Sequence, residues 1–196
     1  MPEHLGRALN LRQARGDKIY TGAYMISAPA TKGADKQAYI AETVIGALWR
    51  RRDSFRQLWP TAPMAFGTDA RPTLQRVHAW LTQSNGWGPF MAYQAVVDMR
   101  FTPLLDAAED IATWAAAGPG TLRGLNRIHG RPFKAPLSQE RALVEMRAIY
   151  KVVQQETGVA MDFSDVPNIL CETDKYLRTK NGEGTPRARY VPGRGW

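Results

Sequence analysis

Three groups of polar residues in this 196-residue chain have types and spacings that could support chemistry. The first is Gln94 and Asp98, which are four residues apart in a mostly apolar run and would lie side by side on one helix face. Trp87, Phe90 and Tyr93 stand close to them in the sequence. This face is either a structural hydrogen-bond network or a pocket wall in which the aromatic rings hold a flat ligand and Gln94 binds its edge.

The second group follows the glycine-flanked proline of residues 118–120. Glycines let the backbone turn sharply there, and Thr121 is expected to cap the next helix. Arg123 and Arg127 lie one helical turn apart, where they could bind a phosphate together with N–H groups of the turn. This layout is typical of a helix-hairpin-helix. The predicted DNA-binding residues are Gly118, Gly120, Thr121, Arg123, Gly124 and Arg127.

The third group, close to the C-terminus, consists of Glu172, Asp174, Lys175 and Arg178. Asp174 and Arg178 have the i, i+4 spacing of a helical ion pair, so the simplest interpretation is a solvated charged face. The alternative is a catalytic cluster, in which a carboxylate accepts a proton and a cation binds an anionic group. The residues by themselves leave both interpretations open.

Charge and cysteine content narrow the class of protein. Lys and Arg number 26 against 18 acidic residues, for a net charge of +8, which favours a polyanionic partner over a merely solvated basic surface. The single cysteine, Cys171, excludes an internal disulfide and suits a reducing cytoplasm. No signal peptide and no membrane-spanning apolar run is visible. None of the three histidines has the spacing of a metal site.

Apolar residues recur at helical spacing, and no series of alternating strands is visible, so we expect an all-α protein. Helices are predicted at residues 36–59, from 72, from 89, at 104–117, from 121, at 138–158 and at 165–180. One predicted apolar stripe consists of Phe90, Tyr93, Val97 and Phe101. In the last helix, the residues predicted to face inward are Val166, Leu170, Thr173 and Leu177.

The composition also predicts how the chain is divided. Residues 1–35 contain scattered glycines and basic side chains and are expected to form an irregular basic arm that packs Tyr20, Tyr24 and Met25 on the body. Residues 36–180 form the predicted helical domain. Residues 181–196, with several glycine and proline breaks among arginines, are expected to be a flexible basic tail.

Three segments, in order, carry a family resemblance: Gly86–Gln94 with Asp98, the turn at 118–120 with the helix after it, and Leu170–Tyr176 with Arg178. Over about residues 20–180 they resemble phage thymine-hypermodification proteins. These are the alpha-glutamyl/putrescinyl thymine pyrophosphorylases, or amino acid:DNA transferases, and the helical domain of 5-hydroxymethyldeoxyuridine DNA kinases. The resemblance implies a helix-hairpin-helix DNA-glycosylase-like fold. Thr173 departs from it, because an aromatic residue is expected there.

The resemblance implies an enzyme that works on double-stranded phage DNA in the cytoplasm of the infected bacterium. An amine co-substrate, such as an amino acid or putrescine, would replace the (pyro)phosphate on 5-(pyro)phosphoryloxymethyluracil. The chain lacks a Gly-x-x-x-x-Gly-Lys-Ser/Thr loop, which favours this transferase over a kinase. No cofactor is specified, and a divalent metal on the pyrophosphate is compatible with the chemistry but has no supporting ligand spacing.

The same resemblance assigns roles to the site residues once the base is flipped out of the duplex. Trp87, Phe90 or Tyr93 would stack on the uracil, and Gln94 would bind its amide edge. Lys175 or Arg178 would bind the leaving group. The proton of the amine would go to Asp98, Glu172 or Asp174.

Two other functions stay open: a non-catalytic helix-hairpin-helix DNA-binding module, and a DNA glycosylase acting on a modified pyrimidine. The second is disfavoured because the turn is not followed by the Val-Asp-Thr-His-type segment of active glycosylases. The sequence carries no signal for an oligomeric state.

Overall fold

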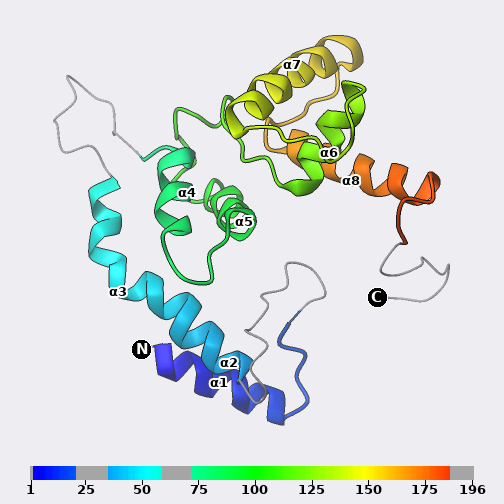
Figure 1. The fold of residues 1–196 in the computed structure, drawn as a ribbon. Helices are drawn as coiled ribbons and strands as arrows, with labels where there is room; N and C mark the ends of the chain where they lie inside the picture. Colours follow the sequence, from blue (N-terminus) through cyan, green and yellow to red (C-terminus); the bar gives the residue numbers. More distant parts are fainter. Residues whose placement is uncertain (1, 21–34, 59–71, 186–196) are drawn as a thin grey trace, which may run out of the picture. The chain divides into compact units, whose positions relative to one another are not determined.

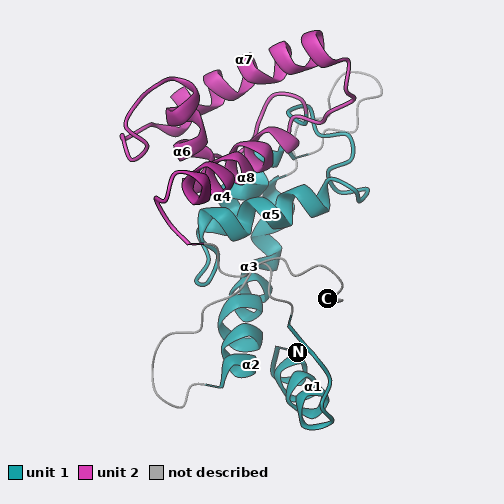
Figure 2. Ribbon diagram, turned by 90° about the vertical axis from the view of Figure 1, so that its right-hand side faces the viewer, with its two compact units in different colours: residues 1–111 teal, residues 112–196 magenta. Residues whose placement is uncertain are grey.

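A computed structural model describes residues 2–20, 35–58 and 72–185, and every regular element in these ranges is helical (Figure 1). The all-α prediction is therefore confirmed for the described chain. None of these helices has the length and hydropathy that crossing a membrane requires. The chain divides into two compact units, Met1–Ile111 and Ala112–Trp196 (Figure 2), and each is described by itself.

Several sequence predictions fall outside the described ranges. They concern Tyr24 and Met25 of the predicted arm, the end of the first predicted helix at Trp59 and Pro60, and most of the tail after residue 185. The predicted domain limits after residues 35 and 180 stay predictions.

The first unit opens with a helix where the sequence predicted an irregular arm. Helix α1 spans Pro2–Ala14, and Pro2 and Glu3 suit its first turn, where a fixed φ and a negative charge are favourable. Gly6, one of the scattered glycines of the predicted arm, lies within this helix and is buried, and a Cβ there would lie 3.3 Å from the Ala41 side chain. The glycine thus allows close packing of α1 on the next helical run.

That run is helical from residue 36 to 58. A helix was predicted at 36–59, and residue 59 lies outside the described ranges. It comprises α2 (Lys36–Ala38), the π-helical stretch η1 (Tyr39–Ile45), α3 (Gly46–Phe55) and the 3₁₀ turn η2 (Arg56–Leu58). Asp35 caps its start by accepting a hydrogen bond from Gln37 N at 2.9 Å. Ile40, Ala41 and Val44 form its buried face.

Helices α4 (Leu74–Thr82) and α5 (Pro89–Met99) complete the first unit. The Thr73 side chain caps α4, so this helix begins two residues after the predicted Pro72. Helix α5 begins at Pro89 as predicted. Its buried face runs through Ala92, Tyr93 and Val96, so the predicted stripe was wrong: Phe90 and Phe101 are 47% and 76% exposed.

Residues 101–118 contain turns and irregular backbone, so the helix predicted at 104–117 is absent. Pro103 disfavours helical backbone at Thr102. The Thr102 hydroxyl donates to Met99 O at 2.6 Å and accepts from Leu104 N at 3.3 Å, which offers the chain a local alternative to a helix. Asp110 then accepts hydrogen bonds from Leu74 N and Gln75 N and caps α4.

The second unit consists mainly of α6 (Pro119–Ile128), α7 (Gln139–Thr157) and α8 (Asp165–Lys180). Ser138 caps α7 and Gly158 ends it with φ +62°, both as predicted. Ser164 precedes α8 as predicted but makes no capping bond; the Asp165 carboxylate accepts from Asp162 N instead, at 2.8 Å. The unit's core residues include Leu125, Ala142, Met146, Phe163, Val166 and Leu170.

Candidate functional site

The glycines of α6 allow α8 to pack unusually close. A Cβ on Gly120 would lie 2.4 Å from Cys171 Sγ, and one on Gly124 would lie 2.5 Å from Leu170 O, both far inside contact distance. Thr121 lies within α6 rather than at its cap, which is Gly118, and its hydroxyl donates to Pro167 O at 3.0 Å. The side-chain positions of these three predicted DNA-binding residues are therefore covered by α8.

This close packing places Asp174 of α8 against the arginines of α6. Asp174 is fully buried and accepts hydrogen bonds from Arg123 Nε at 2.7 Å and Arg127 Nε at 3.0 Å. The prediction that Thr173 faces inward was wrong: Thr173 is exposed, and Asp174 takes the inward position. A buried carboxylate requires such partners, and two arginines one helical turn apart supply them.

The chain after α8 brings a second carboxylate to Arg127. Gly182 has φ +68°, and hydrogen bonds run from Gly182 N to Thr179 O and from Glu183 N to Arg178 O, at 3.3 and 2.8 Å. This is a Schellman motif, which requires glycine at the left-handed position. It places the Glu183 carboxylate in an ion pair with the Arg127 guanidinium.

The Arg127–Glu183 pair changes both protonation equilibria. The hydrogen bonds from Arg127 to Glu183 and to Asp174 raise the pKa of the arginine. The hydrogen bond from Arg127 is also the main reason why the pKa of Glu183 lies below its ordinary value. Glu183 is consequently an anion at neutral pH. Glu183 was not among the predicted site residues, although Asn181-Gly182 after a helix is a recognisable signal for such a helix end.

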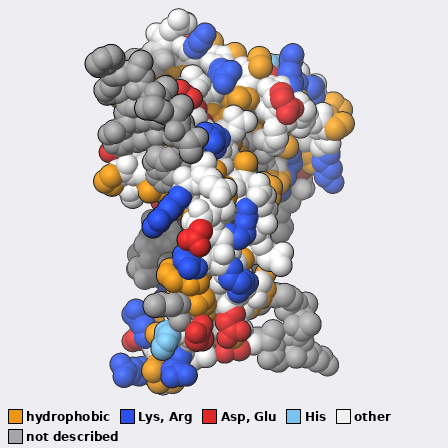
Figure 3. Space-filling view, turned by 90° about the vertical axis from the view of Figure 1, so that its left-hand side faces the viewer, with side chains coloured by type: hydrophobic (Ala, Val, Ile, Leu, Met, Phe, Trp, Pro, Cys, Tyr) orange, Lys and Arg blue, Asp and Glu red, His pale blue; other side chains and the backbone are white. Residues whose placement is uncertain are grey.

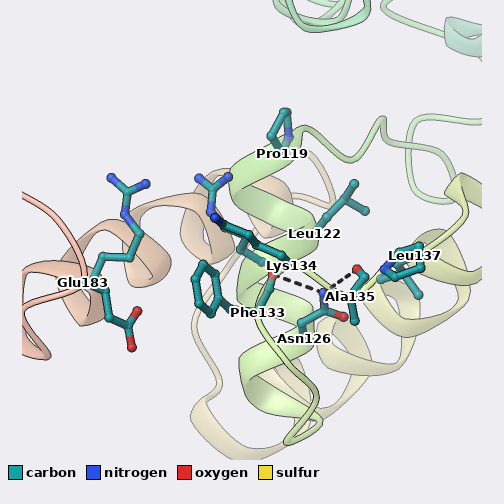
Figure 4. A pocket seen from close by; sticks show the side chains of 11 residues that line it. Pro119, Leu122, Asn126, Phe133, Lys134, Ala135, Leu137 and Glu183 are labelled. Carbon is teal, nitrogen blue, oxygen red and sulfur yellow. Dashed lines mark hydrogen bonds between the residues drawn. The ribbon is translucent and has the colours of Figure 1, made fainter.

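A pocket of about 590 Å³ opens beside this network (Figure 4). Its lining consists of Pro119, Leu122, Arg123, Asn126, Phe133, Lys134, Ala135, Pro136, Leu137, Arg178 and Glu183. In and behind the pocket, four cationic side chains (Arg123, Arg127, Lys134 and Arg178) stand against two carboxylates (Asp174 and Glu183), which leaves two excess positive charges. The pocket therefore favours an anionic ligand.

Asn126 positions the loop that supplies Phe133 and Lys134 to the pocket. Its Nδ2 donates to Phe133 O at 3.3 Å and Ala135 O at 2.9 Å, as the dashed lines of Figure 4 show. The Arg127 guanidinium lies 5.4 Å from the centre of the Phe133 ring, within cation–π distance. Asn126, Phe133 and Lys134 line the pocket, and none of them was predicted as a site residue. The available signal was a Phe-Lys pair between two prolines, at 132 and 136.

A second buried carboxylate, Glu145 of α7, joins α7 to the end of α6. Arg131 donates to it from both Nη atoms at 2.8 and 2.7 Å, and Arg141 donates from Nε at 2.8 Å. Another Schellman motif, with Gly130 at φ +62°, sets the position of Arg131. The hydrogen bonds from Arg131 are the largest cause that lowers the pKa of Glu145 to about 2.

The other predicted residues of α8 lie away from the pocket lining. Lys175 Nζ forms an ion pair with Glu172 Oε1 at 2.5 Å, and these side chains are 56% and 69% exposed. This pair matches the solvated-face interpretation of the sequence. Of the four charged residues predicted in α8, Arg178 alone lines the pocket, and Asp174 lies behind it.

The aromatic group predicted to hold the base belongs to the first unit. Trp87 Nε1 donates to Val44 O at 3.0 Å, and a Cβ on Gly86 would lie 2.6 Å from Val44 Cγ2, so the glycine turn packs on η1. Tyr93 is buried, Gln94 is half-buried and Asp98 is exposed. The predicted convergence of this group with α6 and α8 involves both units and stays a prediction.

Among the described residues no metal-binding cluster stands out, and the face drawn in Figure 3 is not uniformly basic. In the described ranges, no three histidine, cysteine or acidic residues are close enough to hold a metal ion. On the face drawn in Figure 3, lysine and arginine side chains are interspersed with acidic and hydrophobic ones. Within the described residues, we therefore take the pocket of the second unit as the candidate site.

Comparison with protein families gives one informative result. Residues 2–185 match the family model described as 5-hmdU DNA kinase, helical domain. No curated protein and no solved structure matches the chain.

Proposed function

Because this match spans most of its length, the chain belongs to the 5-hmdU DNA kinase helical-domain family, and we propose that it acts in the hypermodification of thymine in DNA. The proposed substrate is double-stranded DNA that carries 5-(pyro)phosphoryloxymethyluracil. An amine nitrogen, from an amino acid or a polyamine, bonds to the exocyclic methylene carbon as the C–O bond breaks. The (pyro)phosphate leaves with the bonding electrons, and the amine loses a proton.

One observation carries this proposal: the pocket lined by Arg123, Lys134 and Arg178 has more positive than negative charge. Negative charge develops on the leaving oxygen as the C–O bond breaks, and preorganised cations stabilise it. Arg123 is held by Asp174 through Nε, and no hydrogen bond within the described chain uses its two Nη atoms. These Nη atoms are suited to bind the oxygens of a phosphoryl group.

The pocket modifies the catalytic roles implied by the resemblance. Asp174 is better suited to positioning Arg123 and Arg127 than to contacting an amine, because its side chain is fully buried and each of its oxygens already accepts a hydrogen bond from one of these arginines. Asp98 and Glu172 stay candidates for the proton acceptor. Arg178 keeps its proposed role at the leaving group, and Arg123 and Lys134 join it.

A second function is favoured by the burial of Asp174. If its carboxylate serves only to hold arginines, the same pocket fits a non-catalytic module that binds DNA phosphates. Neither function requires a helix-hairpin-helix, whose first helix is absent from residues 101–118. A DNA-glycosylase-like fold stays a prediction.

The test is to incubate the protein with DNA containing 5-pyrophosphoryloxymethyluracil and a panel of amines, then digest the DNA and analyse the nucleosides by mass spectrometry. An amine-bearing nucleoside is the expected product. Abasic sites would indicate a glycosylase instead, and bound but unchanged DNA would indicate the binding module. Arg123→Ala should abolish most product formation. Arg141→Ala, on the Glu145 cluster, is the matched control and should retain it.

A further inference from the structure

Glu183 places a carboxylate at the cationic pocket. It is paired with Arg127, and the charge of Arg178 contributes to the low pKa of Glu183. The following residue, Gly184, lies over the Arg178 guanidinium: a Cβ at Gly184 would be 3.9 Å from Arg178 Cζ. Part of the pocket wall is therefore already in contact with an anion that belongs to the chain itself.

In this arrangement the Arg178 guanidinium keeps a hydrogen-bond donor that is not used within the described chain. Arg178 Nε is buried and has no hydrogen-bond partner in the described part of the chain. A carboxylate has two oxygens, and Glu183 uses both of them on Arg127. A phosphoryl group offers three oxygens and a larger charge, so it could bind Arg127 and Arg178 together.

We infer that Glu183 occupies a second phosphoryl subsite of the pocket, formed by Arg127 and Arg178, and that a ligand with two linked phosphoryl groups displaces it. One phosphoryl group binds at this subsite and the other between Arg123 and Lys134. The inference rests on the proposed function for the role of the pocket, and it deepens that function by favouring a diphosphoryl over a monophosphoryl ligand.

The local structure allows this displacement. Glu183 lies outside α8, and the left-handed Gly182 separates it from the helix end. Besides Arg127, the only side chain of the described residues that donates a hydrogen bond to its carboxylate is Asn181, at 3.3 Å. Rotation of the Glu183 side chain can therefore expose Arg127 while the Asp174 pair keeps that arginine in place.

The test compares the wild type with Glu183→Gln by isothermal titration calorimetry, with inorganic pyrophosphate and orthophosphate as probes. Removing a competing charge beside the subsite should tighten pyrophosphate binding about tenfold and orthophosphate binding less than about threefold. Glu156→Gln is the matched control, because it removes the same charge from an exposed position of α7 that does not line the pocket. It should change either affinity less than about twofold.

Arg178→Ala is the second variant, and it should remove the preference for pyrophosphate. Unchanged pyrophosphate affinity in Glu183→Gln, an equal gain for both anions, or the same gain in Glu156→Gln would overturn the inference. The outcome is separable from the transferase assay. Selective pyrophosphate binding without an amine product would keep the inference and reject the transferase, and product formation with no effect of Glu183→Gln would do the reverse.

Discussion

The two buried carboxylates of the second unit, Glu145 and Asp174, are both paired with arginines, but the two clusters differ in which guanidinium nitrogens they leave available. Glu145 receives both Nη atoms of Arg131, so that guanidinium is committed to the protein. Asp174 receives only the Nε atoms of Arg123 and Arg127. The first arrangement braces α7 against the end of α6, whereas the second leaves both Nη atoms of Arg123 beside the pocket. Arg127 differs from Arg123, because its Nη atoms are paired with Glu183.

The helix ends show the same contrast. Gly130 and Gly182 each occupy the left-handed position of a Schellman motif, and each is followed by a charged residue. After α6 this residue is Arg131, which goes to a buried carboxylate. After α8 it is Glu183, which goes to an arginine at the pocket. The same backbone motif thus supplies a cation to the Glu145 cluster after α6 and an anion to the pocket after α8.

The largest expected effect is on folding and comes from Asp174→Ala. It would leave two partly buried arginines without their carboxylate, which typically costs about 3–5 kcal/mol in the free energy of unfolding. Urea denaturation measures this loss. Glu172→Ala, on the exposed face of the same helix, should cost less than about 0.5 kcal/mol. Similar losses for the two variants would remove the distinction between the two faces of α8.

The close approach of α6 and α8 is tested by Gly124→Ala. The added methyl group would lie 2.5 Å from the carbonyl oxygen of Leu170 and should force the helices apart, at a cost of about 1–3 kcal/mol. Gly88→Ala is the matched control, since no atom of the described chain, apart from the adjacent residues, lies within 4 Å of a Cβ there. It should cost less than about 1 kcal/mol, the scale of an N-cap change. Thermal unfolding that is unaffected by Gly124→Ala would contradict the packing.

The Glu145 cluster predicts a dependence of stability on pH. Because folding lowers the pKa of Glu145 from 4.5 to about 2, its ionised form stabilises the protein fully above pH 4.5. That stabilisation is lost as the pH falls from 4.5 to about 2. It should amount to about 1–3 kcal/mol, allowing for solvent screening of the exposed Arg141. Urea denaturation of wild type and Glu145→Gln across this range should show stabilities that converge at low pH; a constant difference would exclude this role.

Local signals in the sequence predicted much of the fold. Pro89 at a first helical position, Ser138 as a cap and Gly158 as a helix end all act within a few residues, and the structure has them as expected. The helix predicted at 104–117 is absent, and the hydrogen bonds of the Thr102 hydroxyl to the adjacent backbone could not be read from the sequence. Helix α1 was not predicted, because the glycine at position 6 serves packing with a distant segment.

The candidate site was harder to predict, because it depends on contacts between residues about 50 positions apart. Arg123, Arg127, Asp174 and Arg178 were selected from their types, but the pairing of Asp174 with α6 requires the glycines of α6 to meet α8. Charged residues are rarely buried, so Thr173 rather than Asp174 was predicted to face inward. Lys134 and Glu183 enter the pocket through a loop and a helix end, where helical periodicity carries no information.

The most direct test of the account is pyrophosphate binding by the double variant Arg123→Ala/Lys134→Ala, measured by calorimetry beside the wild type and Arg141→Ala. Loss of two phosphoryl contacts should weaken binding by a factor of about 30 or more, whereas Arg141→Ala should bind within about threefold of the wild type. Equal binding by the wild type and the double variant, both remaining folded, would contradict the assignment of the Asp174 pocket as the anion site.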